Sequence, residues 1–183
     1  GVQLASGAWT VPAQSEDEVC FATYFDFSKV PDAVPDWARV ECDDPNEQGC
    51  FAYSRNLLSQ DPQSHHAILF LYRGEAGISD AGWGTWACRG GDATGTRCDP
   101  TDIGVPAAAG GADCGAGSVC ATAPVSATGC VGFGPRNFRR DTVQVQGSQE
   151  PVSENYHPDG VYSIWPMAGI IIWNSHAFNL TGT

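Results

Sequence analysis

The sequence is built from short runs rich in β-branched and aromatic residues, each bounded by clusters of Pro, Gly, Asn and Asp. The runs lie at residues 8–11, 19–27, 49–54, 67–72, 131–133, 142–146, 161–164 and 170–173. Short runs of this composition are typical of β-strands. The 22 glycines and 12 prolines supply turns between them. We therefore expect an all-β chain, and specifically a β-sandwich.

Length and charge limit the class of protein further. A chain of 183 residues is long enough to bury a core without help from a metal, and we expect one domain over residues 1–183. The net charge of −12 repels phosphate backbones and anionic lipids, so nucleic acid is not an expected partner. The longest apolar stretch, residues 161–173, is interrupted by Ser163 and Pro166 and is too short to span a bilayer.

Eight cysteines stand at positions 20, 42, 50, 88, 98, 114, 120 and 130. Zinc fingers and ribbons need two closely spaced cysteine pairs, and these spacings provide none. Disulfides are therefore the better interpretation, and they imply an oxidising compartment. We expect a secreted or periplasmic protein. The sequence leaves the pairing of the cysteines open.

Residues 74–134 differ from the rest because they are rich in Gly, Ala, Asp and Thr and hold five of the eight cysteines. A segment of this composition contributes little to a hydrophobic core and needs crosslinks to become ordered. We expect a cysteine-rich loop insertion within the single domain. A separate small cysteine-rich module is the alternative.

Histidine is scarce, yet two of the four histidines are neighbours. His65 and His66 precede the apolar run 67–72, and His176 follows the run 170–173. Imidazole is the commonest protein ligand of transition metals, and three imidazoles suit copper or zinc. Adjacent residues of a flat strand point to opposite faces, so His65 and His66 can share one ion only where the strand begins, bends or bulges. The alternative is one surface histidine and one core histidine.

The amino-acid sequences of these segments resemble those of a known family. Residues 64–70, Ser-His-His-Ala-Ile-Leu-Phe, are similar to the His-His-x-x-Leu-Phe segment of the copper type II, ascorbate-dependent monooxygenases, the family of peptidylglycine α-hydroxylating monooxygenase and dopamine β-monooxygenase. Residues 156–161 resemble that family's Pro-Glu-Gly turn, and residues 170–179 resemble its apolar strand ending in His-Tyr-x-Asn. The opening at residues 9–13, with Cys20, also fits the start of the family's N-terminal domain.

The resemblance implies a jelly-roll β-sandwich that is the first of two copper domains. It implies that His65, His66 and His176 hold a copper that takes electrons from a reductant such as ascorbate. A second copper domain, C-terminal to this chain, would then hydroxylate a C–H bond with dioxygen. The His-x-His pair and following Met of that second domain do not occur here, so the chain resembles one half of a monooxygenase. Ala177 stands where the family has Tyr.

Two other functions stay open on the sequence alone. A disulfide-rich extracellular binding module would use its aromatic loops to hold a partner, and a non-catalytic copper carrier would use the same three histidines without a second domain. Among the remaining candidates, His157 is expected in a turn. The acidic group Asp43, Asp44 and Glu47 lacks the spacing of a calcium loop. Ser64, Asn174, Ser175 and Asn179 are candidates to orient the imidazoles.

Overall fold

Antiparallel strands form almost all the regular structure of this chain. The computed structural model describes residues 1–45, 47–103 and 111–182. The strands are β1 (Ser15–Asp26), β2 (Arg39–Val40), β3 (Cys50–Tyr53), β4 (Arg55–Ser59), β5 (Ser64–Tyr72), β6 (Trp86–Arg89), β7 (Val119–Thr122), β8 (Val125–Ser126), β9 (Thr142–Ser148), β10 (Val152–Tyr156), β11 (Ser163–Pro166) and β12 (Ala168–Asn179). The helices are single turns: η1 (Phe27–Lys29), η2 (Asp36–Ala38), η3 (Ala81–Trp83) and α1 (Ala127–Cys130). The prediction of an all-β chain is confirmed.

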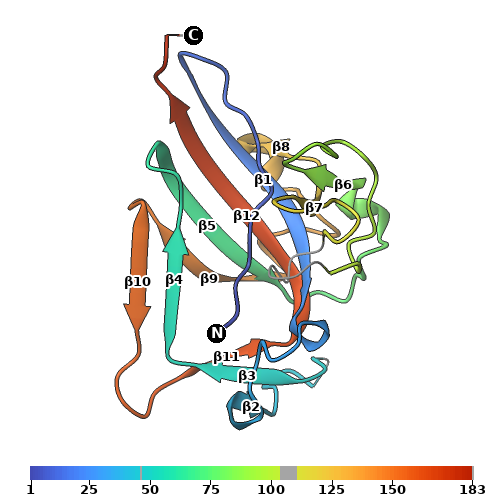
Figure 1. Ribbon diagram of the computed structural model, residues 1–183, viewed down its shortest axis with the longest axis vertical. Helices are drawn as coiled ribbons and strands as arrows, with labels where there is room; N and C mark the ends of the chain where they lie inside the picture. The colour runs from blue at the N-terminus through green and yellow to red at the C-terminus, as the bar shows by residue number, and fades with distance from the viewer. Residues whose placement is uncertain (46, 104–110, 183) are drawn as a thin grey trace.

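The largest sheet has the strand order β6-β7-β1-β12-β5-β9, with β8 also paired to β1. Its centre consists of the long strands β1, β12 and β5, which run side by side (Figure 1). β1 and β12 pair along their whole length, from Ser15 opposite Asn179 to Asp26 opposite Ala168. Two smaller sheets, β10-β4 and β11-β3-β2, complete the fold.

The main core fills the space between the large sheet and the two small ones. Phe21, Phe25 and Ile171 point from one face of the large sheet into a cluster that also contains Phe51 of β3 and Leu58 of β4. This is the two-layer packing of a β-sandwich. The N-terminal segment adds partly buried side chains to the same cluster.

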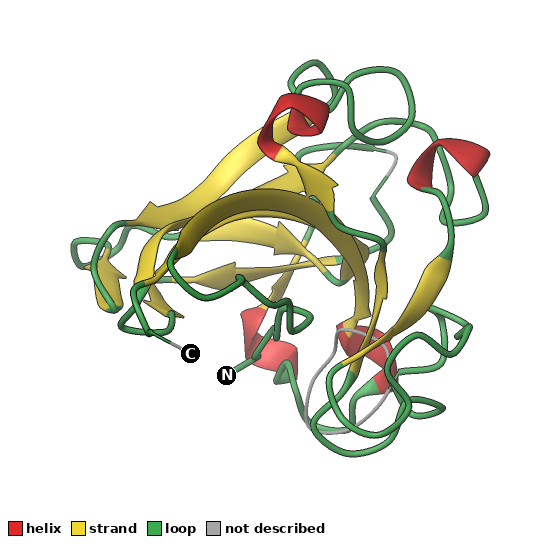
Figure 2. Cartoon of the chain, turned by 90° about the horizontal axis from the view of Figure 1, so that it is seen from above, coloured by secondary structure: helices red, strands yellow, loops and turns green. Residues whose placement is uncertain are grey.

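The opposite face of the large sheet is also covered, here by loops. Ile170 and Ile172 of β12 pack in a second cluster with Trp83, Phe133 and Phe138. In the view of Figure 2 the short helices and many of the loops lie around the curved sheet, on its upper, right and lower sides. Strands that are buried on both faces have unbroken apolar sequences, and this explains why the run at residues 170–173 does not alternate. None of the helices in the described part of the chain is long and apolar enough to cross a membrane.

All eight cysteines form disulfides: Cys20–Cys130, Cys42–Cys50, Cys88–Cys114 and Cys98–Cys120. Two of these bonds lie within the cysteine-rich segment 74–134, and a third joins it to β1. The segment extends the large sheet, because β6 pairs with β7 and both β7 and β8 pair with β1. Its residues 104–110 lie outside the described part of the chain.

Two of the expected strands are wrong. Residues 8–11 are irregular, and the half-buried Trp9 packs against the main core without any ladder. Residues 131–133 form a turn after α1, where Phe133 lies edge-on to Trp83 with ring centroids 6.0 Å apart. In both places the aromatic residue that suggested a strand serves packing alone. The strand expected at 161–164 begins only at Ser163 and continues to Pro166.

Candidate metal centre

A β-bulge in β5 brings the two neighbouring histidines to one side of the sheet. His66 pairs with His176 of β12, and the next pair along the ladder is Ser64 with Ala177. His65 is therefore an extra residue, so that two residues of β5 oppose one residue of β12, as in a bulge. The expectation that the strand must be distorted here for the rings to meet is confirmed.

The three imidazoles form one cluster. A ring nitrogen from each of His65, His66 and His176 lies within 4.8 Å of the others. Nδ1 of His65 is 3.2 Å from Nδ1 of His176, and the ring centroids are 4.9 to 5.5 Å apart. Bonds of roughly 2.1 Å, as between zinc and imidazole, hold two nitrogens of a tetrahedral site roughly 3.4 Å apart. The nitrogens of His65 and His176 have about this spacing, the nitrogen of His66 lies within 4.8 Å of both, and the three-imidazole donor set suits a late first-row metal ion.

The cluster is open on the side of His65. The His65 side chain is exposed, whereas His66 and His176 are half-buried. A shallow, mostly apolar groove of about 350 Å³ begins at His65 and is lined further by Pro62, Gln149, Phe178 and Leu180, among others. The rings of His65 and Phe178 meet edge to face at 5.2 Å. Of the three rings, that of His65 is therefore the most accessible to a molecule that approaches this end of the sheet.

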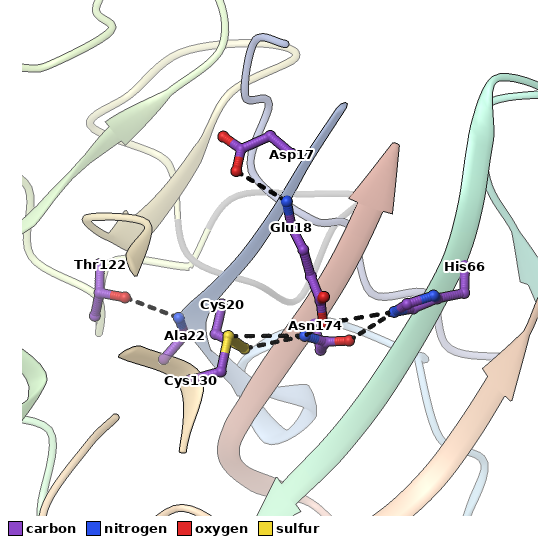
Figure 3. Close-up of a disulfide and its surroundings, with 8 residues drawn as sticks. All are labelled: Asp17, Glu18, Cys20, Ala22, His66, Thr122, Cys130 and Asn174. Atoms are coloured by element: carbon purple, nitrogen blue, oxygen red, sulfur yellow. Dashed lines mark hydrogen bonds and ion pairs between the residues drawn. A yellow bond between two sulfur atoms is a disulfide. The ribbon is translucent and has the colours of Figure 1, made fainter. Parts of the chain in front are cut away.

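Asn174 links the cluster to the interior. Its Oδ1 lies 3.0 Å from Nε2 of His66, and its Nδ2 donates to Glu18 Oε1 at 2.8 Å. The same amide nitrogen is 3.3 Å from Sγ of Cys20 and 3.7 Å from Sγ of Cys130, so the amide rests against this disulfide (Figure 3). Asn174 is buried, with 7% of its surface exposed.

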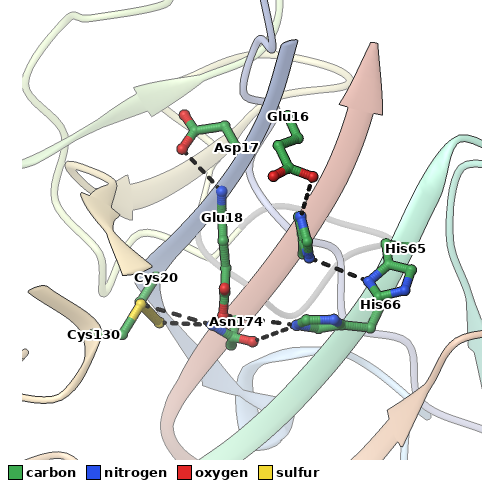
Figure 4. A network of polar contacts seen from close by, with 9 residues as sticks. Glu16, Asp17, Glu18, Cys20, His65, His66, Cys130 and Asn174 are labelled. Atoms are coloured by element: carbon green, nitrogen blue, oxygen red, sulfur yellow. Dashed lines mark hydrogen bonds and ion pairs between the residues drawn. A yellow bond between two sulfur atoms is a disulfide. The ribbon is translucent and has the colours of Figure 1, made fainter. Parts of the chain in front are cut away.

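Two carboxylates of β1, those of Glu16 and Glu18, lie near the imidazoles (Figure 4). Glu16 Oε2 is 3.7 Å from Nε2 of His176, and Glu18 Oε1 is 3.8 Å from Nε2 of His66. No pattern in the sequence singled out either residue. Glu16 and Glu18 are two residues apart on β1, so both carboxylates lie on the same face as His176 of the paired strand β12. The sequence shows the two-residue spacing, but only the register between the strands shows that these carboxylates lie beside the histidines.

Of the four residues expected to orient the imidazoles, the structure places Asn174 against His66. Asn179 instead donates from Nδ2 to the carbonyl oxygen of Val11 at 2.9 Å. Ser175 is the neighbour of Asn174 on β12, so its side chain points to the other face of the sheet. Ser64 pairs with Ala177 beyond the bulge, and it lines the groove.

The other histidine lies elsewhere. Nε2 of His157 is 2.9 Å from Oγ of Ser163, and its backbone N–H donates to the carbonyl oxygen of Ser54. His157 thus fastens the connection between β10 and β11, in keeping with the turn that was expected.

Glu47, one of the three residues of the acidic group, is paired with a cation. Glu47 lies between Cys42 and Cys50, and its Oε1 is 3.6 Å from Nη1 of Arg73. Burial raises the pKa of the Glu47 carboxyl, while Arg73 opposes that shift. The sulfurs of Cys42 and Cys50 are joined to each other and so supply no thiolate. Among the described residues of this loop, Asp43, Asp44 and Glu47 do not gather into the oxygen cage that calcium requires.

Comparison of the chain with models of known families, with characterised proteins and with solved structures finds no match.

Proposed function

We propose that this chain binds one copper ion through His65, His66 and His176 and is the electron-supplying half of a copper-dependent monooxygenase. The observation that carries the copper site is the bulge, which directs two consecutive imidazoles toward a third on the neighbouring strand. A bulge costs ladder hydrogen bonds, and bulges recur beside functional sites. The resemblance of residues 64–70 and 170–179 to the monooxygenase family extends this site to electron transfer.

The residues around the cluster suit that role. Three neutral imidazoles are acceptable ligands for both oxidation states of copper. Bound copper would supply a one-electron couple, fed by a reductant such as ascorbate. β5 and β12 hold the rings in place because they are anchored in two hydrophobic clusters. Exposure of His65 leaves one side open to a reductant or to a partner domain.

The finer parts of the proposal follow the same resemblance. The sandwich would have jelly-roll connectivity, and the partner would be a second copper domain C-terminal to this chain. The four disulfides indicate an oxidising compartment, and we propose that the protein is exported, to the periplasm or beyond the cell.

The direct test is a titration of the metal-free protein with Cu(I) and with Cu(II), followed by exposure of the Cu(II) form to ascorbate. We expect one copper per chain, and we expect ascorbate to bleach the Cu(II) signal in electron paramagnetic resonance. His66→Ala should abolish stoichiometric binding. His157→Ala removes an imidazole outside the cluster and should leave the copper stoichiometry unchanged. Unchanged stoichiometry in His66→Ala would refute the site.

The same titration separates the two alternatives. A chain that binds copper but does not exchange electrons with ascorbate would be a copper carrier. A chain that binds no copper after reconstitution would be a disulfide-rich binding module, and its groove beside Phe178 would become the candidate surface.

A further inference from the structure

The carboxylates of Glu16 and Glu18, both on β1, face the Nε2 atoms of His176 and His66. Glu16 and Glu18 are two positions apart on β1, so their side chains share a face of the sheet. The register pairs Glu18 with His176, and His176 in turn pairs with His66. These three side chains therefore form one row across β1, β12 and β5. Figure 4 shows the Glu18 side chain directed toward Asn174 and His66, and the Glu16 carboxylate pointing toward the same cluster.

The Glu18 carboxylate determines which atoms donate and which accept in the hydrogen-bonded chain from Glu18 through Asn174 to His66. An ionised carboxylate only accepts, so the Asn174 atom that faces Glu18 at 2.8 Å must be the amide nitrogen. The amide oxygen then faces Nε2 of His66 at 3.0 Å, and this oxygen also only accepts. Nε2 must therefore carry the proton. The neutral ring of His66 is left with a free lone pair on Nδ1.

Packing prevents the amide from turning over and reversing these roles. The register places Asn174 directly opposite Cys20, and the Cys20–Cys130 disulfide lies against the amide nitrogen (Figure 3). A reversed amide would set its oxygen against the acceptor-only carboxylate of Glu18, at the cost of a buried hydrogen bond.

His176 has the same arrangement with a shorter chain of contacts. Its Nε2 faces the carboxylate of Glu16 at 3.7 Å, and its Nδ1 faces Nδ1 of His65 at 3.2 Å. At this distance the carboxylate acts on the ring by electrostatic attraction rather than through a hydrogen bond, and this attraction favours a proton on Nε2, which leaves Nδ1 turned toward the cluster.

We propose that Glu16, and Glu18 acting through Asn174, are positioning residues of this centre. They favour protonation of His176 and His66 on Nε2, make Nδ1 the ligand atom, and favour a doubly charged ion over a singly charged one. The metal selectivity rests on the proposed function, whereas the position of the protons is a property of the metal-free protein. By Coulomb's law each carboxylate attracts a 2+ ion twice as strongly as a 1+ ion. Removal of one carboxylate should therefore lower Cu(II) affinity by about the square of the factor for Cu(I).

The protons can be located in the metal-free protein by long-range ¹H–¹⁵N correlation spectra, which distinguish the two neutral forms of each imidazole. We expect His66 to be protonated on Nε2 in the wild type and to lose this preference in Asn174→Leu. The double variant Glu18→Gln/Asn174→Asp should keep it, because the introduced carboxylate accepts from His66 and from the introduced amide. His157, bonded to Ser163, is an internal reference that should not change. A wild-type His66 protonated on Nδ1, or an Asn174→Leu variant with an unchanged His66, would overturn the proposal.

The affinities of single Glu16 and Glu18 variants for Cu(I) and Cu(II) test the effect of these two charges. Glu16 and Glu18 are partly exposed, so Glu16→Gln and Glu18→Gln should fold normally. Each should weaken Cu(II) binding about tenfold, in the range typical of residues that back metal-bound histidines, and Cu(I) binding about threefold. The matched control is Asp17→Asn, which removes the same charge from the same strand. The Asp17 carboxylate accepts a hydrogen bond from the backbone N–H of Glu18 and, within the described part of the chain, forms no hydrogen bond or ion pair with the imidazoles. Asp17→Asn should change the affinity for Cu(II) and the affinity for Cu(I) by no more than about twofold.

Equal losses for both ions, or losses in Asp17→Asn as large as in Glu16→Gln, would overturn the proposed selectivity. A wild-type chain that binds no copper would refute the proposed function together with the selectivity. The spectra of the metal-free protein would still decide whether the protons lie where we place them.

Discussion

His66 lies directly opposite His176 in the β5–β12 ladder, and the register shifts by one residue immediately beyond this pair. The extra residue is His65. Without the shift, alternation along β5 would send the His65 ring to the other face of the sheet. The whole candidate site therefore depends on one added residue.

Deletion of His65 should restore the regular ladder, because Ser64 already pairs with Ala177 and His66 with His176. We expect the deletion variant to keep its β-sheet circular dichroism and its melting transition while losing stoichiometric copper binding. His65→Ala keeps the extra residue, and therefore the bulge, but removes the imidazole. Comparing its copper binding with that of the deletion variant separates the effect of losing one ligand from the effect of losing the bulge. A deletion variant with wild-type affinity would show that the bulge does not build the site.

The central strands should be sensitive to truncation. Leu71 is 1% exposed and belongs to the main cluster between the sheets. Leu71→Ala should lower the free energy of unfolding by about 3 kcal/mol, because it removes buried methyl groups and leaves a cavity. Val152→Ala changes an exposed residue of β10 and should cost less than about 0.5 kcal/mol. Denaturant unfolding of both variants checks this, and similar costs would contradict the assigned core.

The four disulfides should differ in their contributions. Cys20 and Cys130 are 110 residues apart, whereas Cys42 and Cys50 are 8 apart. In the chain-entropy model the longer loop stabilises by roughly 5 kcal/mol and the shorter by roughly 2.5 kcal/mol. Paired Cys→Ala variants, compared by denaturant unfolding, should show this order. The Cys20–Cys130 variant should also disturb Asn174 and weaken copper binding, whereas the Cys42–Cys50 variant should not.

Glu47 should make stability depend on pH. Burial raises the pKa of its carboxyl above the ordinary 4.5 in the folded protein, partly offset by Arg73. The folded state then holds this proton more tightly than the unfolded state, so the wild type loses stability as the pH rises through a window that starts near 4.5. Glu47→Gln does not titrate and should gain stability relative to the wild type across that window. Unfolding of both proteins between pH 4 and pH 7 checks the sign, and a constant difference would contradict it.

The elements best predicted from the sequence were the long central strands. β1, β5 and β12 carry enough β-branched and aromatic residues to be recognised locally, because they are buried on both faces. Six short strands were missed, namely β2, β4, β6, β7, β8 and β10. The pair β4 and β10 shows why. Their sequences, Arg-Asn-Leu-Leu-Ser and Val-Ser-Glu-Asn-Tyr, carry one fully buried residue, Leu58, and their identity as strands depends on pairing with each other.

The histidine cluster was predictable because its requirement is steric. Two consecutive residues can face one ion only at an irregularity of the strand, and the structure has a bulge at that point. Glu16 and Asn174 were harder to assign. Their contacts depend on the register between strands about 150 residues apart in sequence, and no local pattern encodes that register. The pairing of Cys20 with Cys130 is non-local in the same way.

The most direct measurement is anomalous scattering at the copper edge from crystals of the copper-loaded protein. We expect one strong peak per chain, within bonding distance of Nδ1 of His65, His66 and His176. A peak at any other group, or a peak that contacts only one of these rings, would contradict the proposed centre.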